Sequence, residues 1–178
     1  MNNTPLITLS DIATLRQISA NLNVQKVLNP LIIEAQEFDL KPLLGDEFFN
    51  AIYSDAPTFT DFDDLWNGSE YTYNGKTYTQ CGLKAVLIYF TDARLITRGN
   101  NTSTPNGMVV KETPYSSPTS DKILGMQIQQ AKAGAMAYFE QVSRYLDRMS
   151  NDYPLWRSNC DQPVKRGVIS ISRIRRTK

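Results

Sequence analysis

The chain has 178 residues, of which 41% are hydrophobic and 21% charged, and its formal net charge is +1. This length suits one domain, or one domain with an arm, and the composition is that of a globular protein with a core of its own. Histidine is absent, which excludes Ser-His and Cys-His nucleophiles and removes the commonest metal ligand. No apolar run approaches the length of a membrane span, so we expect no membrane partner.

The first residues and the cysteines bear on the cellular compartment. The opening MNNTPLITLSD lacks the basic and apolar regions of a signal peptide. We therefore expect the chain to stay in the cytoplasm where it is made, or to enter an assembly built there. Cys81 and Cys160 lie far apart without the spacing of metal ligands, and we expect two reduced, partly buried thiols.

Apolar spacing predicts helices in the first third of the chain, over residues 8–19, 24–38 and 46–53. Ser10 or Asp11 is expected to cap the first of them. Pro30 interrupts the second, either as a kink or as the first turn of a new helix. Asp39 is a good N-cap for a following turn. Residues 54–69 are typical of a loop, with one helical turn at 61–66.

The clearest β signal lies in residues 70–79, where two short alternating segments flank Asn74-Gly75. This dipeptide is the one that type I′ turns require, because both central residues take positive φ. The sequence therefore predicts a β-hairpin. Gly75-Lys76-Thr77 also matches the end of a phosphate-binding loop, but Glu70 stands where that loop needs glycine, and a hairpin is the wrong context.

Two long helices are predicted in the second half. Residues 82–97 are apolar nearly all round, which is typical of the buried centre of a domain. Residues 99–120 are predicted to be a polar loop, in which 108–111 could pair as a short strand. A helix over 120–150 has an apolar seam long enough for a bundle spine or a subunit contact. Its seam steps alternately four and three residues: Leu124, Ile128, Ala131, Ala135, Tyr138, Val142, Tyr145 and Met149.

The charges are segregated along the chain. Residues 1–70 hold three basic and eleven acidic residues, whereas residues 163–178 hold six basic residues and no acid. This asymmetry indicates either different partners for the two ends, or a solvated acidic face and a disordered basic tail. The tail is also β-branched without an adjacent partner strand, so it is expected to pair with its own sheet or with another chain. The residues expected to make this contact are Lys165, Arg166, Val168, Ile169, Ile171, Arg173, Ile174, Arg175 and Arg176.

The remaining acidic residues do not form a recognisable chemical site. Asp61, Asp63 and Asp64 resemble the start of a calcium loop, but Trp66 and Thr72 stand where that loop needs glycine and a bidentate acid. Nothing fixes the separation of any carboxylate pair or raises its pKa for acid–base work. We therefore expect no enzyme, no catalytic residue, no metal and no cofactor.

Several segments, taken in order, resemble a known family. They are 39–49 (DLKPLLGDEFF), 64–68 (DLWNG), the Asn-Gly hairpin, 82–94 (GLKAVLIYFTDAR), 107–112 (GMVVKE), 116–120 (SSPTS) and 153–156 (YPLW). Over about residues 24–158 the chain resembles a family of small virion proteins from phages of gut Bacteroidales, including crAss-like phages. The resemblance implies a head–tail connector or head-completion subunit, whose homo-oligomeric, dodecameric neck ring docks beneath the portal, extends the DNA channel and joins capsid to tail.

The elements predict a mainly α fold, a bundle of four to five helices with a β-hairpin insertion and an extended C-terminal arm. The helical domain would span 1–158, with the hairpin at about 70–79 and the long loop at 99–120, and the basic arm would span 159–178. The resemblance implies as partners further copies of the chain, the portal, the next neck or tail protein and, passively, translocating double-stranded DNA. It places the protein in the virion, after assembly in the host cytoplasm.

In such a ring the hairpin is expected to grip the neighbouring subunit through Tyr71, Tyr73, Asn74, Gly75 and Tyr78. The acidic portion would line the channel and repel DNA so that it slides. The basic arm would reach the portal or DNA phosphates. Two alternatives stay open: a tail terminator or head–tail joining protein, which would contain a substantial β-sheet, and a DNA-binding accessory protein.

Overall fold

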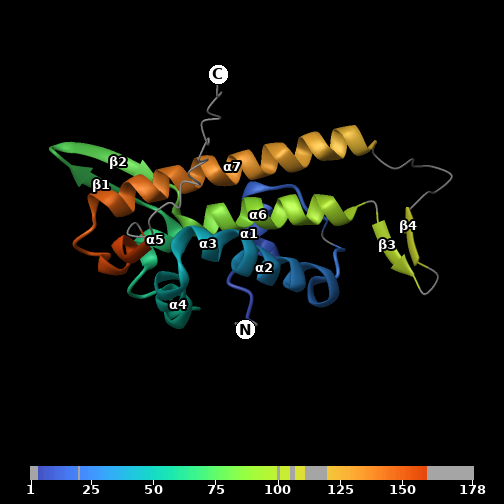
Figure 1. Ribbon diagram of the computed structural model, residues 1–178, viewed down its shortest axis with the longest axis horizontal. Helices are drawn as coiled ribbons and strands as arrows, with labels where there is room; N and C mark the ends of the chain where they lie inside the picture. Colours follow the sequence, from blue (N-terminus) through green and yellow to red (C-terminus); the bar gives the residue numbers. More distant parts are fainter. Residues whose placement is uncertain (1–3, 20, 100, 105–106, 111–119, 160–178) are drawn as a thin grey trace, which may run out of the picture.

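The structure is a computed structural model that describes residues 4–19, 21–99, 101–104, 107–110 and 120–159, and it is mainly helical (Figure 1). Its helices are α1 (Leu9–Leu15), η1 (Val24–Leu28), α2 (Asn29–Ala35), η2 (Gln36–Leu40), α3 (Lys41–Leu44), α4 (Asp46–Asp55), α5 (Asp63–Asn67), α6 (Gly82–Gly99), α7 (Asp121–Arg148) and η3 (Pro154–Asn159). Its strands are β1 (Ser69–Tyr73), β2 (Lys76–Gln80), β3 (Asn101–Thr104) and β4 (Gly107–Val110). The predicted fold class, a mainly α bundle with a β-hairpin, is confirmed. The C-terminal arm lies outside the described residues.

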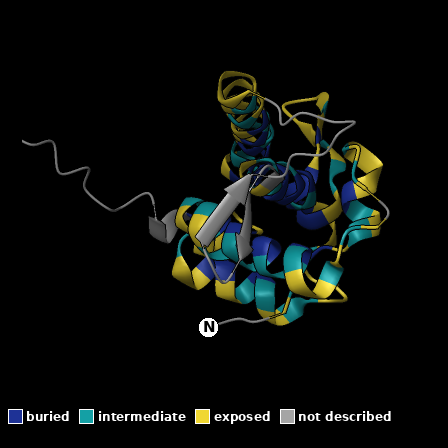
Figure 2. Ribbon diagram, turned by 90° about the vertical axis from the view of Figure 1, so that its right-hand side faces the viewer, coloured by how far each residue is buried: buried dark blue, intermediate teal, exposed yellow. Residues whose placement is uncertain are grey.

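Helix α6 is the buried axis of the bundle. Every side chain from Leu83 to Ala93 is buried except those of Lys84 and Tyr89, which are half-buried. Helix α7 packs antiparallel along α6, while α1, α2 and α5 cover its other sides (Figure 1). In an end-on view the buried residues fill the middle of the bundle and the exposed ones its rim (Figure 2). The predicted central helix is confirmed.

Helix α7 contributes a second set of buried side chains to the core. Its buried residues are Ala131, Ala135, Phe139, Val142, Tyr145 and Leu146, so the predicted seam acts as a bundle spine. Gly134 lies directly against the ring of Tyr89, since a Cβ at Gly134 would come within 2.7 Å of that ring. The Tyr89 ring in turn meets the edge of Tyr138, with centroids 5.1 Å apart. Small residues in α7, Gly134 above all, therefore allow the close approach of the two long helices.

The segment between Val24 and Leu44 is helical throughout, in alternating π and α turns. Pro30 lies in the first turn of α2, which continues from η1 because Leu28 and Asn29 are both in the helical region. The proline therefore lies at a change from π to α turns within one helical segment, where it does not interrupt the helix. The predicted N-cap role of Asp39 is wrong, because Asp39 lies inside η2 and its carboxylate binds Arg94 of α6.

Helix α1 begins at Leu9, one residue before Ser10 and two before Asp11, the two predicted N-caps, and it ends at Leu15, earlier than predicted. Thr8 is the N-cap. Its hydroxyl oxygen accepts a hydrogen bond from the Asp11 N–H at 3.3 Å, and the Asp11 carboxylate accepts one from the Thr8 N–H at 2.8 Å. Asp11 is thus the third residue of a capping box rather than the cap itself. Beyond the helix, the Arg16 guanidinium binds the buried Asp92 of α6 at 2.6 Å.

Two β-hairpins project from opposite ends of the bundle (Figure 1). In the first, Tyr71 faces Tyr78 across the strands, and Asn74 and Gly75 have φ of 50° and 73°, as a type I′ turn requires. This hairpin is confirmed. The short strand expected at 108–111 corresponds to β4, over 107–110, and the prediction of a loop is wrong for 101–104, which pairs with it as β3. Threonine and valine in these segments favour β-strands, whereas the Asn, Gly and Pro residues around them are typical of loops and led to the prediction of a loop.

The base of the first hairpin is held by two glycines. A Cβ at Gly82, whose φ is 79°, would lie 2.3 Å from the Trp66 carbonyl oxygen, and one at Gly68, whose φ is 90°, would lie 2.7 Å from that of Gln80. The buried Gln80 amide donates to the Asp64 carbonyl and accepts from the Gly82 N–H at 2.6 Å. These contacts join the end of α5, the hairpin and the start of α6.

We expect Gly82→Ala to lower the free energy of unfolding by about 1–3 kcal/mol, because alanine is strained at this φ and its Cβ meets backbone. Gly125→Ala in α7 is the matched control. It adds the same methyl group to open space, and should raise stability by up to about 1 kcal/mol through helix propensity. Urea denaturation of both variants measures the difference. Equal effects would contradict the close backbone crossing.

Candidate interaction surfaces

The hairpin residues predicted to contact a neighbouring subunit fall into two groups. Tyr71 and Tyr78 are half-buried and stack on each other with ring centroids 5.7 Å apart. Tyr71 also meets the edge of Tyr145 in α7 at 4.8 Å. The Arg148 guanidinium lies 4.0 Å from the Tyr78 centroid and donates to the Tyr71 hydroxyl at 2.9 Å. These two tyrosines therefore hold the hairpin against its own α7.

The second group lies at the tip of the hairpin. Tyr73 is 38% exposed, and Asn74 and Gly75 are exposed with a turn that projects from the bundle. The outward face of the strands is also exposed and consists of Glu70, Thr72, Thr77 and Thr79. For the tip, contact with a neighbouring subunit stays a prediction.

Arg148 was not identified from the sequence. It lies three residues after Tyr145, one helical turn further along α7, and this spacing is the only local signal of its role. Its guanidinium lies within 6 Å of all three hairpin tyrosines, at 5.9 Å from Tyr71 and 5.3 Å from Tyr73. Such contacts are attractive because the ring faces carry negative charge.

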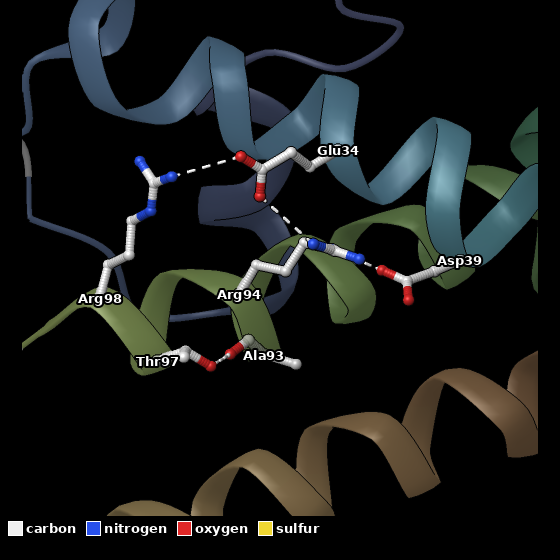
Figure 3. A network of polar contacts seen from close by, with 6 residues as sticks. All are labelled: Glu34, Asp39, Ala93, Arg94, Thr97 and Arg98. Atoms are coloured by element: carbon white, nitrogen blue, oxygen red, sulfur yellow. Dashed lines mark hydrogen bonds and ion pairs between the residues drawn. The ribbon is translucent and has the colours of Figure 1, made fainter.

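A network of charges joins α2 and η2 to α6 (Figure 3). Arg94 binds Asp39 through Nε at 2.6 Å and Glu34 at 3.2 Å, and Arg98 binds the other Glu34 oxygen at 3.3 Å. The Arg94 guanidinium also lies 5.5 Å from the ring centroid of Phe38, which is 68% exposed. These ion pairs fix how the N-terminal helices lie on α6.

The cavities of the described surface do not combine into a chemical site. One of about 180 Å³ lies beside the Arg94 network and includes Lys132 of α7. It is smaller than typical ligand pockets. A larger one, of about 390 Å³, is lined by Leu15, Cys81 and Lys84 among others. Within the described ranges, no group of three or more His, Cys, Asp and Glu residues could hold a metal ion.

The predicted partial burial is wrong for Cys81, whose free thiol is exposed. It immediately precedes α6, where the chain leaves the hairpin, and its thiol donates to the Gln141 side chain at 3.3 Å. Cys160 and the predicted arm residues between 165 and 176 lie outside the described residues.

Tyr145 and Tyr153 form a buried hydroxyl pair between α7 and the segment that follows it, with an O–O distance of 3.1 Å. Burial raises the pKa of Tyr145. Burial and the hydrogen bond with Tyr145 raise the pKa of Tyr153 far above its ordinary value. Both phenols therefore stay protonated near neutral pH and act as a structural contact that secures the end of α7.

Many of the acidic side chains in the first 70 residues are neutralised within the chain. Asp11 pairs with Lys84, Glu34 and Asp39 pair with Arg94, and Glu37 and Asp46 pair with Lys41. Among the acids of these 70 residues, the exposed ones that make no ion pair within the described residues are Glu47, Asp61, Asp63, Asp64 and Glu70. In this part of the chain, exposed unpaired acids are therefore confined to α4, the turn before α5, α5 and the start of β1, and they are fewer than the sequence indicates.

Asp11 couples the capping box to α6. Burial alone would raise the pKa of Asp11, but hydrogen bonds from Lys84 and Thr8 outweigh it and lower that pKa below its ordinary value of 3.8. The Lys84 ammonium lies 2.6 Å from the carboxylate. Because the pKa is depressed in the folded state, the contact stabilises the protein above about pH 4 and is lost as the pH falls through the folded-state pKa.

The described part of the chain is thus a helical protein in which the polar side chains discussed above either hold the helices and the first hairpin together or lie exposed on the surface. A family model described as a family of unknown function, DUF6712, matches residues 40–166. The chain belongs to this family. No curated protein and no solved structure matches it. Among the described helices, none is both long enough and apolar enough to cross a membrane.

We expect Asp11→Asn to lower the free energy of unfolding at pH 7 by about 1 kcal/mol, because the amide can still accept from the Thr8 N–H but lacks the negative charge that pairs with Lys84 and with the helix N-terminus. The gap to the parent protein should narrow below about pH 4, because the Asp11 carboxylate of the parent protein then becomes protonated. Asp61→Asn is the matched control at an exposed acid and should stay within about 0.5 kcal/mol at both pH values. Urea titrations test this, and a gap independent of pH would contradict it.

Arg148→Ala should lower stability by about 1–2 kcal/mol, since it removes a hydrogen bond and the ring contacts, and should speed amide exchange in β1 and β2. The control is Arg144→Ala, whose side chain is exposed and pairs only with Glu140 one turn away; its effect should stay below about 0.5 kcal/mol. Chemical denaturation and hydrogen exchange measure both effects. Unchanged exchange in the hairpin of Arg148→Ala would show that Arg148 does not hold it.

Proposed function

We propose that this chain is a structural virion protein of a tailed phage, a subunit of a homo-oligomeric neck ring. The ring docks beneath the portal, extends the DNA channel and joins capsid to tail. The proposal starts from the resemblance of residues 24–158 to small virion proteins, and membership of a family of unknown function neither supports nor opposes it. It makes the chain an assembly part without an enzymatic reaction of its own.

The observation that best supports this role is the placement of the two hairpins at opposite ends of a rigid helical body (Figure 1). Each hairpin forms a two-stranded sheet of its own, so within the described residues both edges lack a further strand. Open edges are the surfaces on which strands of another chain add. A subunit with an extension at each end can contact a neighbour on each side, as a ring requires.

The exposed, unpaired acids of the first 70 residues are consistent with the same role, although they are fewer than the charge distribution along the sequence suggests. They lie on α4, on α5 and the turn before it, and on β1. We take these elements as the candidate for the channel side, because negative charge repels the DNA backbone. The arm 159–178 would then contact the portal. Its contacts, like those of the hairpin tip, belong to this proposal.

The mainly helical fold favours a connector over a tail terminator or head–tail joining protein, for which a substantial β-sheet is expected. The DNA-binding accessory protein makes a different prediction. The isolated monomer would then bind DNA, and its affinity would fall steeply with salt. An electrophoretic shift assay at two salt concentrations distinguishes this reading from the neck ring.

The direct test is native mass spectrometry of the purified chain, alone and mixed with the portal protein of the same phage. We expect ring-sized assemblies on the portal. Removal of residues 163–178 should abolish them, while the circular dichroism of the variant stays helical. Replacing the six basic residues of this segment by glutamine separates its charge from its length. Unchanged assembly of the truncated chain would refute the role of the arm, and absence of the protein from purified particles would refute the proposal.

A further inference from the structure

Helix α7 has a second stripe on the face opposite its buried seam. Its residues alternate three and four apart, and all of them are exposed: Ile123, Met126, Gln130, Ala133 and Ala137. The side chain of Met126 is 65% exposed and that of Ile123 is 50% exposed. The stripe contains no charged residue. Heptad spacing of uncharged residues on an exposed helix face is typical of a helix–helix contact.

We propose that this stripe binds the same stripe of a second copy of the chain, with the two α7 helices antiparallel and Gln130 at the two-fold axis. The sizes of the side chains along the stripe determine the relative direction of the two helices. The large residues Ile123 and Met126 lie toward the N-terminal end of the stripe, and small residues lie toward the other end. An antiparallel pair centred on Gln130 sets Ile123 against Ala137 and Met126 against Ala133, large against small.

A parallel pair in register would be badly packed. Two isoleucines and two methionines would meet at one end, and alanines would face alanines at the other, which leaves the helices too far apart or a gap between them. Close packing requires that large and small side chains alternate across an interface. The size gradient therefore selects the antiparallel arrangement.

Charge supports the same arrangement independently. Lys122 and Glu140 flank the stripe, and they are eighteen residues apart, which is about five turns of a helix. They therefore lie on the same edge of the stripe. Both are exposed, and Glu140 pairs with Arg144 at its own end of the helix. In the antiparallel pair, Lys122 of each copy meets Glu140 of the other. In a parallel pair this edge of each helix lies on opposite sides of the contact, so Lys122 meets no Glu140 and the charge pairs are lost.

The contact is isologous and closes at two copies. It rests on the described face of α7 alone and does not depend on the neck-ring proposal; in a ring it would join subunits of two different assemblies. α7 has 28 residues, a length of about 42 Å, and one helix pair buries less than a standard interface. The pair should therefore be weak and concentration-dependent.

Cysteine cross-linking tests the geometry in the full-length protein, after Cys81→Ser and Cys160→Ser. Gln130→Cys should give a covalent dimer on mild oxidation, because the two copies meet at the axis. Ile123→Cys alone should not, since its two positions lie about 21 Å apart along the helix, far beyond disulfide reach. Mixed with Ala137→Cys, it should form a heterodimer. Thr72→Cys, exposed on the hairpin, controls for random collision.

Sedimentation equilibrium of variants tests whether the apolar and the charged contacts stabilise the dimer. Met126→Glu should weaken dimerisation at least tenfold without lowering the melting temperature, because the residue is exposed in the single chain. Glu140→Lys should also weaken it, and Lys122→Glu with Glu140→Lys should restore it. Efficient self-cross-linking of Ile123→Cys, or a monomer at every concentration, would overturn the proposal. A loss of ring assembly on the portal would leave this result unchanged, so the two proposals fail separately.

Discussion

Helix α6 has almost no solvent-facing side between Leu83 and Ala93, so other segments have to cover it all round. Each Leu, Val, Ile or Phe buried in this way contributes roughly 1.5–3 kcal/mol, which makes burial of the helix a large contribution to stability. Helix α7 covers one side along its whole length, and the N-terminal helices and α5 cover the rest. Thr91 is buried inside this cover, whereas the charged residues Asp92, Arg94 and Arg98 bind partners from the N-terminal segment.

This arrangement explains why the functional features lie outside the core. The first hairpin is fixed to the start of α6 by Gly82 and held at the side of α7 by Arg148, whereas the second hairpin follows directly from the end of α6. The length of one buried helix thus sets the separation of the two projections. The acids of the N-terminal segment that pair with α6 are neutralised within the chain. In the first 70 residues, the exposed acids without an ion pair among the described residues lie on α4, on α5 and the turn before it, and on β1. A rigid rod with a projection at each end is suited to assembly.

The parts of the fold that local pattern determines were predictable from the sequence. Continuous apolar character identified α6, the seam identified α7, and Asn74-Gly75 identified the first hairpin, because each signal lies within one element. The failures involve contacts between distant segments. Asp39 has the chemistry of a cap, but Arg94 binds its carboxylate; Asp11 serves Thr8 and Lys84 together. The position of Arg148 over three tyrosines depends on how a hairpin folds back on a helix that follows it much later in the chain.

Native-state hydrogen exchange of the intact chain tests most directly whether α6 is the buried axis on which the other elements depend. Amides from Val86 to Ala93, which have acceptors within the helix, should exchange only by global unfolding, with a free energy equal to that from urea denaturation, and should be the slowest in the molecule. The hairpin amides should exchange faster, by local opening. Exchange of the α6 amides as fast as that of the hairpins would contradict the account, because it would show that the bundle opens around α6 without unfolding.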